Sequence, residues 1–150
     1  MSMLKVAGVD ENGQPKGIRT DLNGRTEIAH KWEADEVSVF SETQIRDTSA
    51  VWSDRVNVSK YATISLRVQN THDQPVGVIF GVDTGANSTT YLKNYGGSTL
   101  GFTIPASSDV RLITPEEFPF LQYIKNIRIR CSCSTAPTAG SLSVTIVGKY

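Results

Sequence analysis

Most of this chain reads as one β-strand after another. Residues 61–70 alternate apolar and polar side chains with a period of two, so that Ile64, Leu66 and Val68 share one face. In residues 123–133 the same alternation places Arg128 on the face opposite Ile127. Further strand-like runs cover residues 37–40, 75–82, 100–104, 109–113 and 142–147.

Helix signals are weak by comparison. Residues 29–36 have the composition for a turn or two, and Pro115-Glu116 resembles the start of a short helix, but neither stretch is long enough for a structural helix. About seven or eight strands at roughly 8–12-residue spacing, with turn residues between them, are typical of an antiparallel β-sandwich. The sequence therefore predicts an all-β, jelly-roll-like sandwich.

The first thirty residues follow a different pattern. Asn12-Gly13 and Asn23-Gly24 are strong hairpin signals, because a tight type I′ turn needs positive φ at both central residues. The apolar residues here are too sparse for a separate core, which predicts a β-hairpin arm that packs on the rest of the chain or on another copy. We expect an arm over residues 1–32 and a sandwich over residues 33–150. The expected assembly residues of the arm are Val6, Val9, Asn12, Gly13, Ile18, Leu22, Asn23, Gly24 and Ile28.

Charge and hydropathy exclude two classes of protein. The chain has 15 basic and 15 acidic residues and a formal net charge of zero, whereas a nucleic-acid-binding protein is expected to carry a basic stripe. No run approaches the roughly 18 apolar residues of a membrane span, and residues 1–5 do not begin a secretory signal. We expect synthesis in a cytoplasm, with no nucleic acid partner and no membrane span.

Catalytic signals are missing as well. His30 and His72 are the two histidines, and His72 lies in a polar stretch that we expect to be an exposed loop. No nucleophile motif marks any serine. The acidic pairs at residues 35–36 and 116–117 are sequence neighbours, which do not face each other across a cleft, and we interpret them as solvated loop charges. The sequence thus predicts a protein that is not an enzyme.

Neither a metal nor another cofactor is expected. Residues 10–12 and 21–23 have the oxygen spacing that begins a calcium loop, but the later ligands are missing, and residues 83–87 are better read as a turn. Cys131 and Cys133 lie two apart on one face of a strand, where a disulfide requires distortion. We expect free, buried or half-buried thiols, because no further ligand pair is present for a metal site.

Aromatic residues supply the remaining binding candidates. Trp52, Tyr91 and Tyr95 lie in or beside less regular stretches, where an exposed ring can stack on the face of a sugar. The alternative is that these rings fill the ends of the sandwich core and keep their polar tips in water. Both interpretations stay open for all three residues.

Residues 56–66, 68–76 and 133–144 resemble segments common in small virion proteins of tailed bacteriophages, and the Asp-x-Asn-Gly turns resemble the start of phage tail, baseplate or capsid-decoration proteins. The resemblance covers most of the chain and contains no catalytic motif. It implies a β-sandwich that forms a homo-oligomer, either a trimer or a hexamer. It also implies that this oligomer binds other virion proteins. Some proteins of this kind recognise host-surface glycans.

Together, the residues and the resemblance predict a non-enzymatic structural component of a phage or prophage virion, made in the cytoplasm of a bacterial host. The alternative is a carbohydrate-binding module or receptor-binding head that recognises host-surface glycans through Trp52, Tyr91 or Tyr95.

Overall fold

The structure is a computed structural model of the whole chain, and it describes residues 8–9, 15–16, 34–83 and 89–150. The chain divides into two compact units, Met1–Lys31 and Trp32–Tyr150. In the first unit, β1 (Gly8–Val9) pairs antiparallel with β2 (Pro15–Lys16), with Val9 opposite Pro15. Of the arm residues expected to act in assembly, only Val9 is among the described residues. The others, including the expected turns at Asn12-Gly13 and Asn23-Gly24, lie outside them.

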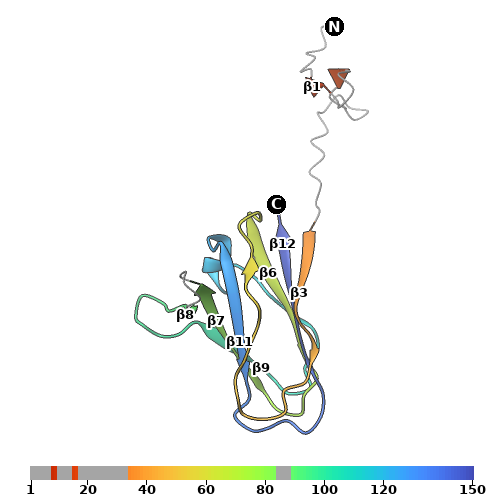
Figure 1. Cartoon of the computed structure of the whole chain (residues 1–150), viewed down its shortest axis with the longest axis vertical. Coiled ribbons are helices and arrows are strands. Elements are labelled where there is room, and N and C mark those ends of the chain that lie inside the picture. The colour runs from red at the N-terminus through yellow and green to blue at the C-terminus, as the bar shows by residue number, and fades with distance from the viewer. Residues whose placement is uncertain (1–7, 10–14, 17–33, 84–88) are drawn as a thin grey trace. The chain divides into compact units, whose positions relative to one another are not determined.

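In the described residues of the second unit, strands are joined by turns and loops, and one short 3-10 helix is present, η1 (Pro119–Gln122). The strands are β3 (Ala34–Thr43), β4 (Val51–Trp52), β5 (Val56–Asn57), β6 (Thr63–Asn70), β7 (Val76–Asp83), β8 (Thr89–Tyr91), β9 (Gly101–Ile104), β10 (Arg111–Ile113), β11 (Asn126–Ser132) and β12 (Leu142–Lys149). They form two antiparallel sheets that pack together, which confirms the predicted β-sandwich. Figure 1 views the two layers edge-on, with β3, β6 and β12 in one and β7 and β11 in the other.

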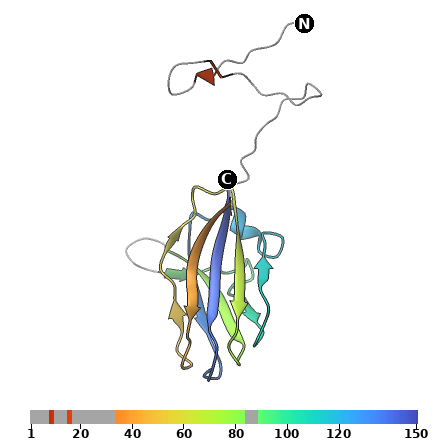
Figure 2. The ribbon, with the colours of Figure 1, turned by 90° about the vertical axis from the view of Figure 1, so that its right-hand side faces the viewer.

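The strand order is that of a jelly roll. One sheet has the order β10-β6-β12-β3, seen face-on in Figure 2, and the other has the order β4-β11-β7-β8, with β5 beside β11 and β9 beside β7. The antiparallel pairs are nested along the chain: β3 pairs with β12, β4 and β5 with β11, β6 with β10, and β7 with β9. Such nesting is a long hairpin folded over into two sheets, as in the double Greek key.

The core lies between the sheets and follows from the alternation in the sequence. On β11, Ile127, Ile129 and Cys131 are 0% exposed, and the arginines between them face outward. Leu142, Val144 and Ile146 do the same on β12. The buried apolar residues are Phe40, Ile45, Val58, Tyr61, Ile64, Leu66, Val68, Val76, Val78, Phe80, Ile104, Ile113, Leu121, Ile127, Ile129, Cys131, Cys133, Leu142, Val144 and Ile146.

Two local expectations differ from the structure. Residues 34–36 begin the strand β3, so the helical turn expected over residues 29–36 is wrong for its described part. Residues 115–117 form a turn, and the 3-10 helix starts only at Pro119. The turn is held by Glu117 Oε2, which accepts a hydrogen bond from the Thr114 backbone N–H at 3.0 Å. The connection from β11 to β12 carries the chain from one sheet to the other.

Candidate functional site

Trp52 and Tyr91 meet on the outer face of the six-stranded sheet. Their ring centroids lie 5.6 Å apart with 28° between the ring planes, which is a stacked arrangement. Val51 and Leu92, their chain neighbours, pack against the core, so the two rings point away from it. Of the two interpretations in the sequence, this placement excludes the one in which Trp52 and Tyr91 fill the sandwich core.

The pair joins opposite edges of the sheet. Trp52 is on β4 and Tyr91 is on β8, and β11 and β7 lie between them, a separation of roughly 14 Å at the usual strand spacing. A centroid distance of 5.6 Å therefore requires both side chains to reach inward across the sheet. Gly81 makes room for this, because it lies directly opposite Tyr91 in the register and carries no side chain. Gly81 is buried although its face of the sheet is the outer one.

Arg128 completes this group. Its guanidinium carbon lies 5.2 Å from the centre of the Trp52 ring, within the range of a cation–π contact. Arg128 Nε donates a hydrogen bond to the Ser53 carbonyl at 3.0 Å, which fixes the guanidinium beside β4. In turn the Ser53 hydroxyl accepts a hydrogen bond from the Ile129 backbone N–H at 2.9 Å. We call Trp52, Tyr91 and Arg128 the aromatic platform. Its rings keep exposed surface, with Tyr91 41% exposed.

Tyr95 is separate from this group. It is fully exposed at the tip of the hairpin between β8 and β9. That hairpin is closed by Asn94, whose side chain accepts a hydrogen bond from Ser98 N–H at 2.9 Å and whose carbonyl accepts one from Gly97 N–H, also at 2.9 Å. No ring contact joins Tyr95 to a described residue, so the structure brings together two of the three predicted stacking residues.

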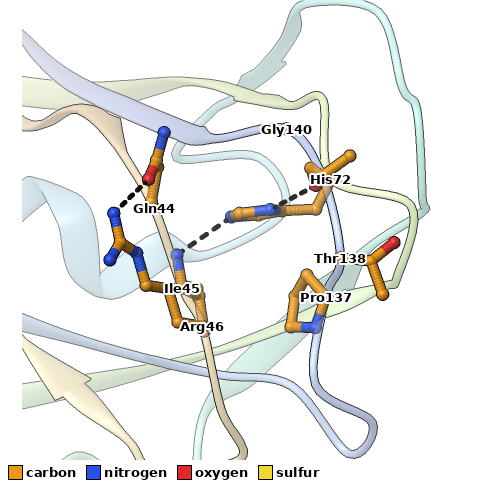
Figure 3. Close-up of a pocket in the computed structure, with 8 residues that line it drawn as sticks. Gln44, Ile45, Arg46, His72, Pro137, Thr138 and Gly140 are labelled. Atoms are coloured by element: carbon orange, nitrogen blue, oxygen red, sulfur yellow. Dashed lines mark hydrogen bonds between the residues drawn. The ribbon is translucent and has the colours of Figure 1, made fainter.

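His72 lines a pocket of about 240 Å³ at one end of the sandwich (Figure 3). The pocket is lined by Gln44, Ile45, Arg46, His72, Pro137, Thr138, Ala139 and Gly140. His72 itself is 1% exposed, so the expected exposed loop position is wrong. The polar residues around it misled the prediction, because they bond the loop inward. Asn70, for example, is also buried and donates to the carbonyls of Gln74 and Pro105.

Both ring nitrogens of His72 already have partners. The Ile45 backbone N–H donates a hydrogen bond to His72 Nε2 at 3.3 Å, so Nε2 is the acceptor and carries no hydrogen. The ring hydrogen is therefore on Nδ1, which donates it to the Ala139 carbonyl at 2.9 Å. Figure 3 shows the ring between these two groups. The arrangement uses His72 to hold three loops together and leaves neither nitrogen available for proton transfer to a substrate.

Asp35 is the centre of a polar cluster at the start of β3. Its Oδ2 accepts hydrogen bonds from Lys60 Nζ at 2.6 Å, Tyr150 Oη at 2.6 Å and Tyr61 Oη at 2.9 Å. The hydrogen bond from Lys60, followed by those from the two tyrosines, lowers the pKa of Asp35 to about 2. Next along the strand, Glu36 forms a two-pronged ion pair with Arg67, at 2.7 and 2.9 Å. The interpretation of residues 35–36 as solvated loop charges is therefore wrong: both carboxylates are on a strand and are paired.

The two cysteines are free and buried, as predicted. Burial raises the pKa of the Cys131 thiol to about 12. Burial also raises the pKa of Cys133, and the negative charge of Asp73 raises it further. Protonated thiols in an apolar core are neither good nucleophiles nor good metal ligands.

Within the described ranges, no three His, Cys, Asp or Glu side chains are grouped as a metal ion requires. The two segments with the oxygen spacing of a calcium loop, residues 10–12 and 21–23, lie outside those ranges, as do residues 84–87. Among the same residues, none forms a helix with the length and apolar character needed to cross a bilayer. Glu116 and Glu117 are both exposed, as expected of a solvated pair. No protein-family model matches the chain, and no curated protein matches it either.

Arg128 and Lys60 are among the residues of these groups that sequence patterns did not single out, as are Tyr61, Arg67 and Tyr150. Arg128 was expected only to face away from the core, which it does. Lys60 lies 4.9 Å from the Tyr61 ring centre and 5.7 Å from that of Tyr150, and nothing in the sequence links residues 35, 60 and 150. The alternation of residues 123–133 was the available signal for Arg128, and no comparable signal existed for Lys60.

Proposed function

We propose that this protein is a non-enzymatic structural component of a bacteriophage or prophage virion, part of the tail or baseplate or associated with the capsid. It acts by assembling with copies of itself and with other virion proteins. The resemblance of its sequence segments to small phage virion proteins motivates the virion part of the proposal. The jelly-roll fold is compatible with it, since this fold occurs in viral capsid and lectin domains, although a fold alone does not define a function.

The observation that carries the assembly mechanism is the position of β3. This ten-residue strand is at the edge of its sheet, where β12 pairs with one side and no described strand pairs with the other. An edge strand presents unpaired N–H and C=O groups, which are a template for another strand. Unpaired negative charges on an edge strand would oppose the addition of another strand. Here Asp35 and Glu36 are paired with Lys60 and Arg67, which offsets their charge.

Residues 1–31 supply the matching element. They precede β3 in the chain, and β1 and β2 show that part of this segment adopts β-structure. Addition of a strand from one subunit to the edge of the next links copies through main-chain hydrogen bonds, without large charged patches. A neutral protein with 15 basic and 15 acidic residues fits such a mechanism.

The test compares the solution mass of the full chain with that of a variant lacking residues 1–31, by light scattering over a concentration series. We expect a trimer or hexamer for the full chain and a lower mass for the deletion variant, which keeps the whole core. A matched variant with Leu4, Val6 and Val9 replaced by serine keeps the chain length and should also lower the mass. A full chain that stays monomeric at every concentration, or a mass unchanged by the deletion, would refute this mechanism. Mass spectrometry of purified particles from the host tests the virion assignment itself.

The aromatic platform favours a second function, that of a carbohydrate-binding module or receptor-binding head. Sugar rings bind to exposed aromatic faces because their C–H groups pack against the ring, and aromatic side chains on an accessible surface are typical of recognition sites. Trp52 and Tyr91 supply such a surface on one face of the sandwich. This function is compatible with the first, since a virion subunit can also carry a receptor site.

A further inference from the structure

The face of the sheet that carries the aromatic platform also carries basic residues. Arg130 lies directly opposite Trp52 in the register between β11 and β4, so both side chains are on the same face. Lys93 is two residues beyond Tyr91 and is exposed, and its backbone bridges to Thr99. With Arg128, three basic residues therefore lie on or beside the face that carries the two rings. The acidic residues there are Asp83 at the end of β7 and the exposed Asp54, two residues beyond Trp52.

Several positions at the centre of this face are glycines, with the half-buried Ile79 between two of them. Gly77, Gly81 and Gly101 alternate with the inward-facing residues of β7 and β9, and therefore lie on the outer side. At Gly101 a side chain is excluded, since a Cβ there would lie 2.2 Å from the Val78 carbonyl oxygen. The rings therefore lie beside a face on which the glycines leave low positions to either side of the half-buried Ile79 side chain.

We propose that the aromatic platform binds an acidic saccharide, and this inference rests on the second proposed function above. The C–H face of a sugar ring packs on the exposed surface of Tyr91, which Trp52 supports by stacking, and the carboxylate of a sialic or uronic acid pairs with Arg130 and Lys93. Arg128 is a positioning residue, because its contacts with Ser53 and the Trp52 ring fix the orientation of the indole. Arginine suits a carboxylate because its guanidinium donates two parallel hydrogen bonds.

An acidic saccharide fits this charge better than a nucleic acid does. A nucleic acid carries one phosphate per nucleotide, and its binding depends on a continuous basic surface that neutralises many of them. Here the cations are few and lie on or beside one face of a sheet, in a chain of zero net charge. One or two carboxylates match that number.

The experiment follows the fluorescence of Trp52. The chain has two tryptophans, so Trp32→Phe leaves Trp52 as the only indole. The full chain with this change is titrated with matched pairs of ligands, 3′-sialyllactose against lactose and oligogalacturonate against its methyl ester. We expect a saturable change in fluorescence with at least one acidic member, and about tenfold weaker binding of its neutral partner, as the loss of a charge-assisted hydrogen bond implies.

Three variants separate the contributions. Arg130→Gln should weaken binding of the acidic ligand about tenfold and leave the neutral ligand unchanged. Tyr91→Ala should abolish the binding of both, and Tyr123→Ala, which removes an exposed tyrosine outside these strands, should change neither. Thermal melting of each variant verifies that the fold is intact.

The outcomes distinguish the two proposals. Equal binding of acidic and neutral partners that is lost in Tyr91→Ala keeps the carbohydrate-binding function and overturns the inference of acidic specificity. Absence of binding by every ligand, with Trp52 fluorescence unchanged, overturns both.

Discussion

Tyr150 donates a hydrogen bond from its hydroxyl to Asp35 Oδ2 at 2.6 Å, so the residue that follows β12 closes onto the second residue of β3. The two residues are 115 positions apart in the sequence. Lys60 and Tyr61 donate to the same oxygen, and the hydrogen bond from Tyr150 raises the pKa of that tyrosine. This single carboxylate oxygen thus connects the segment before β6 with the start of β3 and the end of β12, which are neighbours in the four-stranded sheet.

The first prediction concerns the stability of the protein in acid. The pKa of Asp35 falls from its ordinary 3.8 to about 2 in the folded protein, so the folded state binds the proton more weakly than the unfolded state does. Its stabilising contribution is therefore complete above about pH 4 and is lost as the pH falls from about 4 to 2. We expect Asp35→Asn to reduce the pH dependence of the denaturant midpoint within this window.

Asp109→Asn is the control for that experiment, because it removes the same charge from an exposed loop residue. Asp35→Asn should differ from it below pH 4 in the slope of stability against pH. Equal slopes for the wild-type protein and Asp35→Asn would show that the cluster does not hold the carboxylate ionised.

The second prediction concerns Gly148, on which the ring of Tyr61 lies. A Cβ at this glycine would lie 2.5 Å from Cγ of Tyr61, and the Tyr61 ring has little room to move because it is buried and bonded to Asp35. Gly148→Ala should lower the free energy of unfolding by about 1–3 kcal/mol, as overpacked cores do. Gly77→Ala on β7 is the matched control, since its Cβ would meet its nearest atom at an ordinary 3.6 Å.

A double-mutant cycle tests the cause. When Tyr61→Ala removes the ring, the penalty of Gly148→Ala should largely disappear. The same penalty in both backgrounds, measured by urea unfolding, would locate the strain elsewhere.

The fold was predictable because each long strand has one solvent-facing side and one side that faces the core. In β6 and β12 every second residue is buried, and a period of two is visible in a sequence without knowledge of the partner strands. The alternation around Arg128 and the burial of Cys131 were predicted for the same reason. These predictions are confirmed because each depends on a pattern within a single strand.

The site was less predictable because its residues meet through the strand order. Trp52 and Tyr91 were both candidates, but their stacking depends on the order β4-β11-β7-β8 and on the missing side chain of Gly81. His72 was placed wrongly because a polar loop and a buried, fully bonded loop have the same composition. Long-range relationships of this kind have no local pattern.

The third prediction concerns the two thiols. Cys131 is 0% exposed and its pKa is raised to about 12 by burial, so almost no thiolate exists at pH 8, and Cys133 is buried beside it. We expect neither cysteine to react with Ellman's reagent in the native protein, and both to react once it is unfolded in denaturant. Rapid reaction of one thiol under native conditions would mean that this end of β11 opens readily.

The fourth prediction concerns the role of His72 as a structural link. His72→Phe keeps a buried ring but leaves the Ile45 N–H and the Ala139 carbonyl without partners, and each unsatisfied buried group costs about 1–3 kcal/mol. We expect a loss of about 2 kcal/mol or more in urea unfolding and faster hydrogen exchange at the Ile45 amide. His72→Gln is the matched control, because its amide provides both an acceptor and a donor, and it should lose less. Equal stability of His72→Phe and the wild-type protein would mean that the two hydrogen bonds do not hold these loops, and that packing alone places the ring.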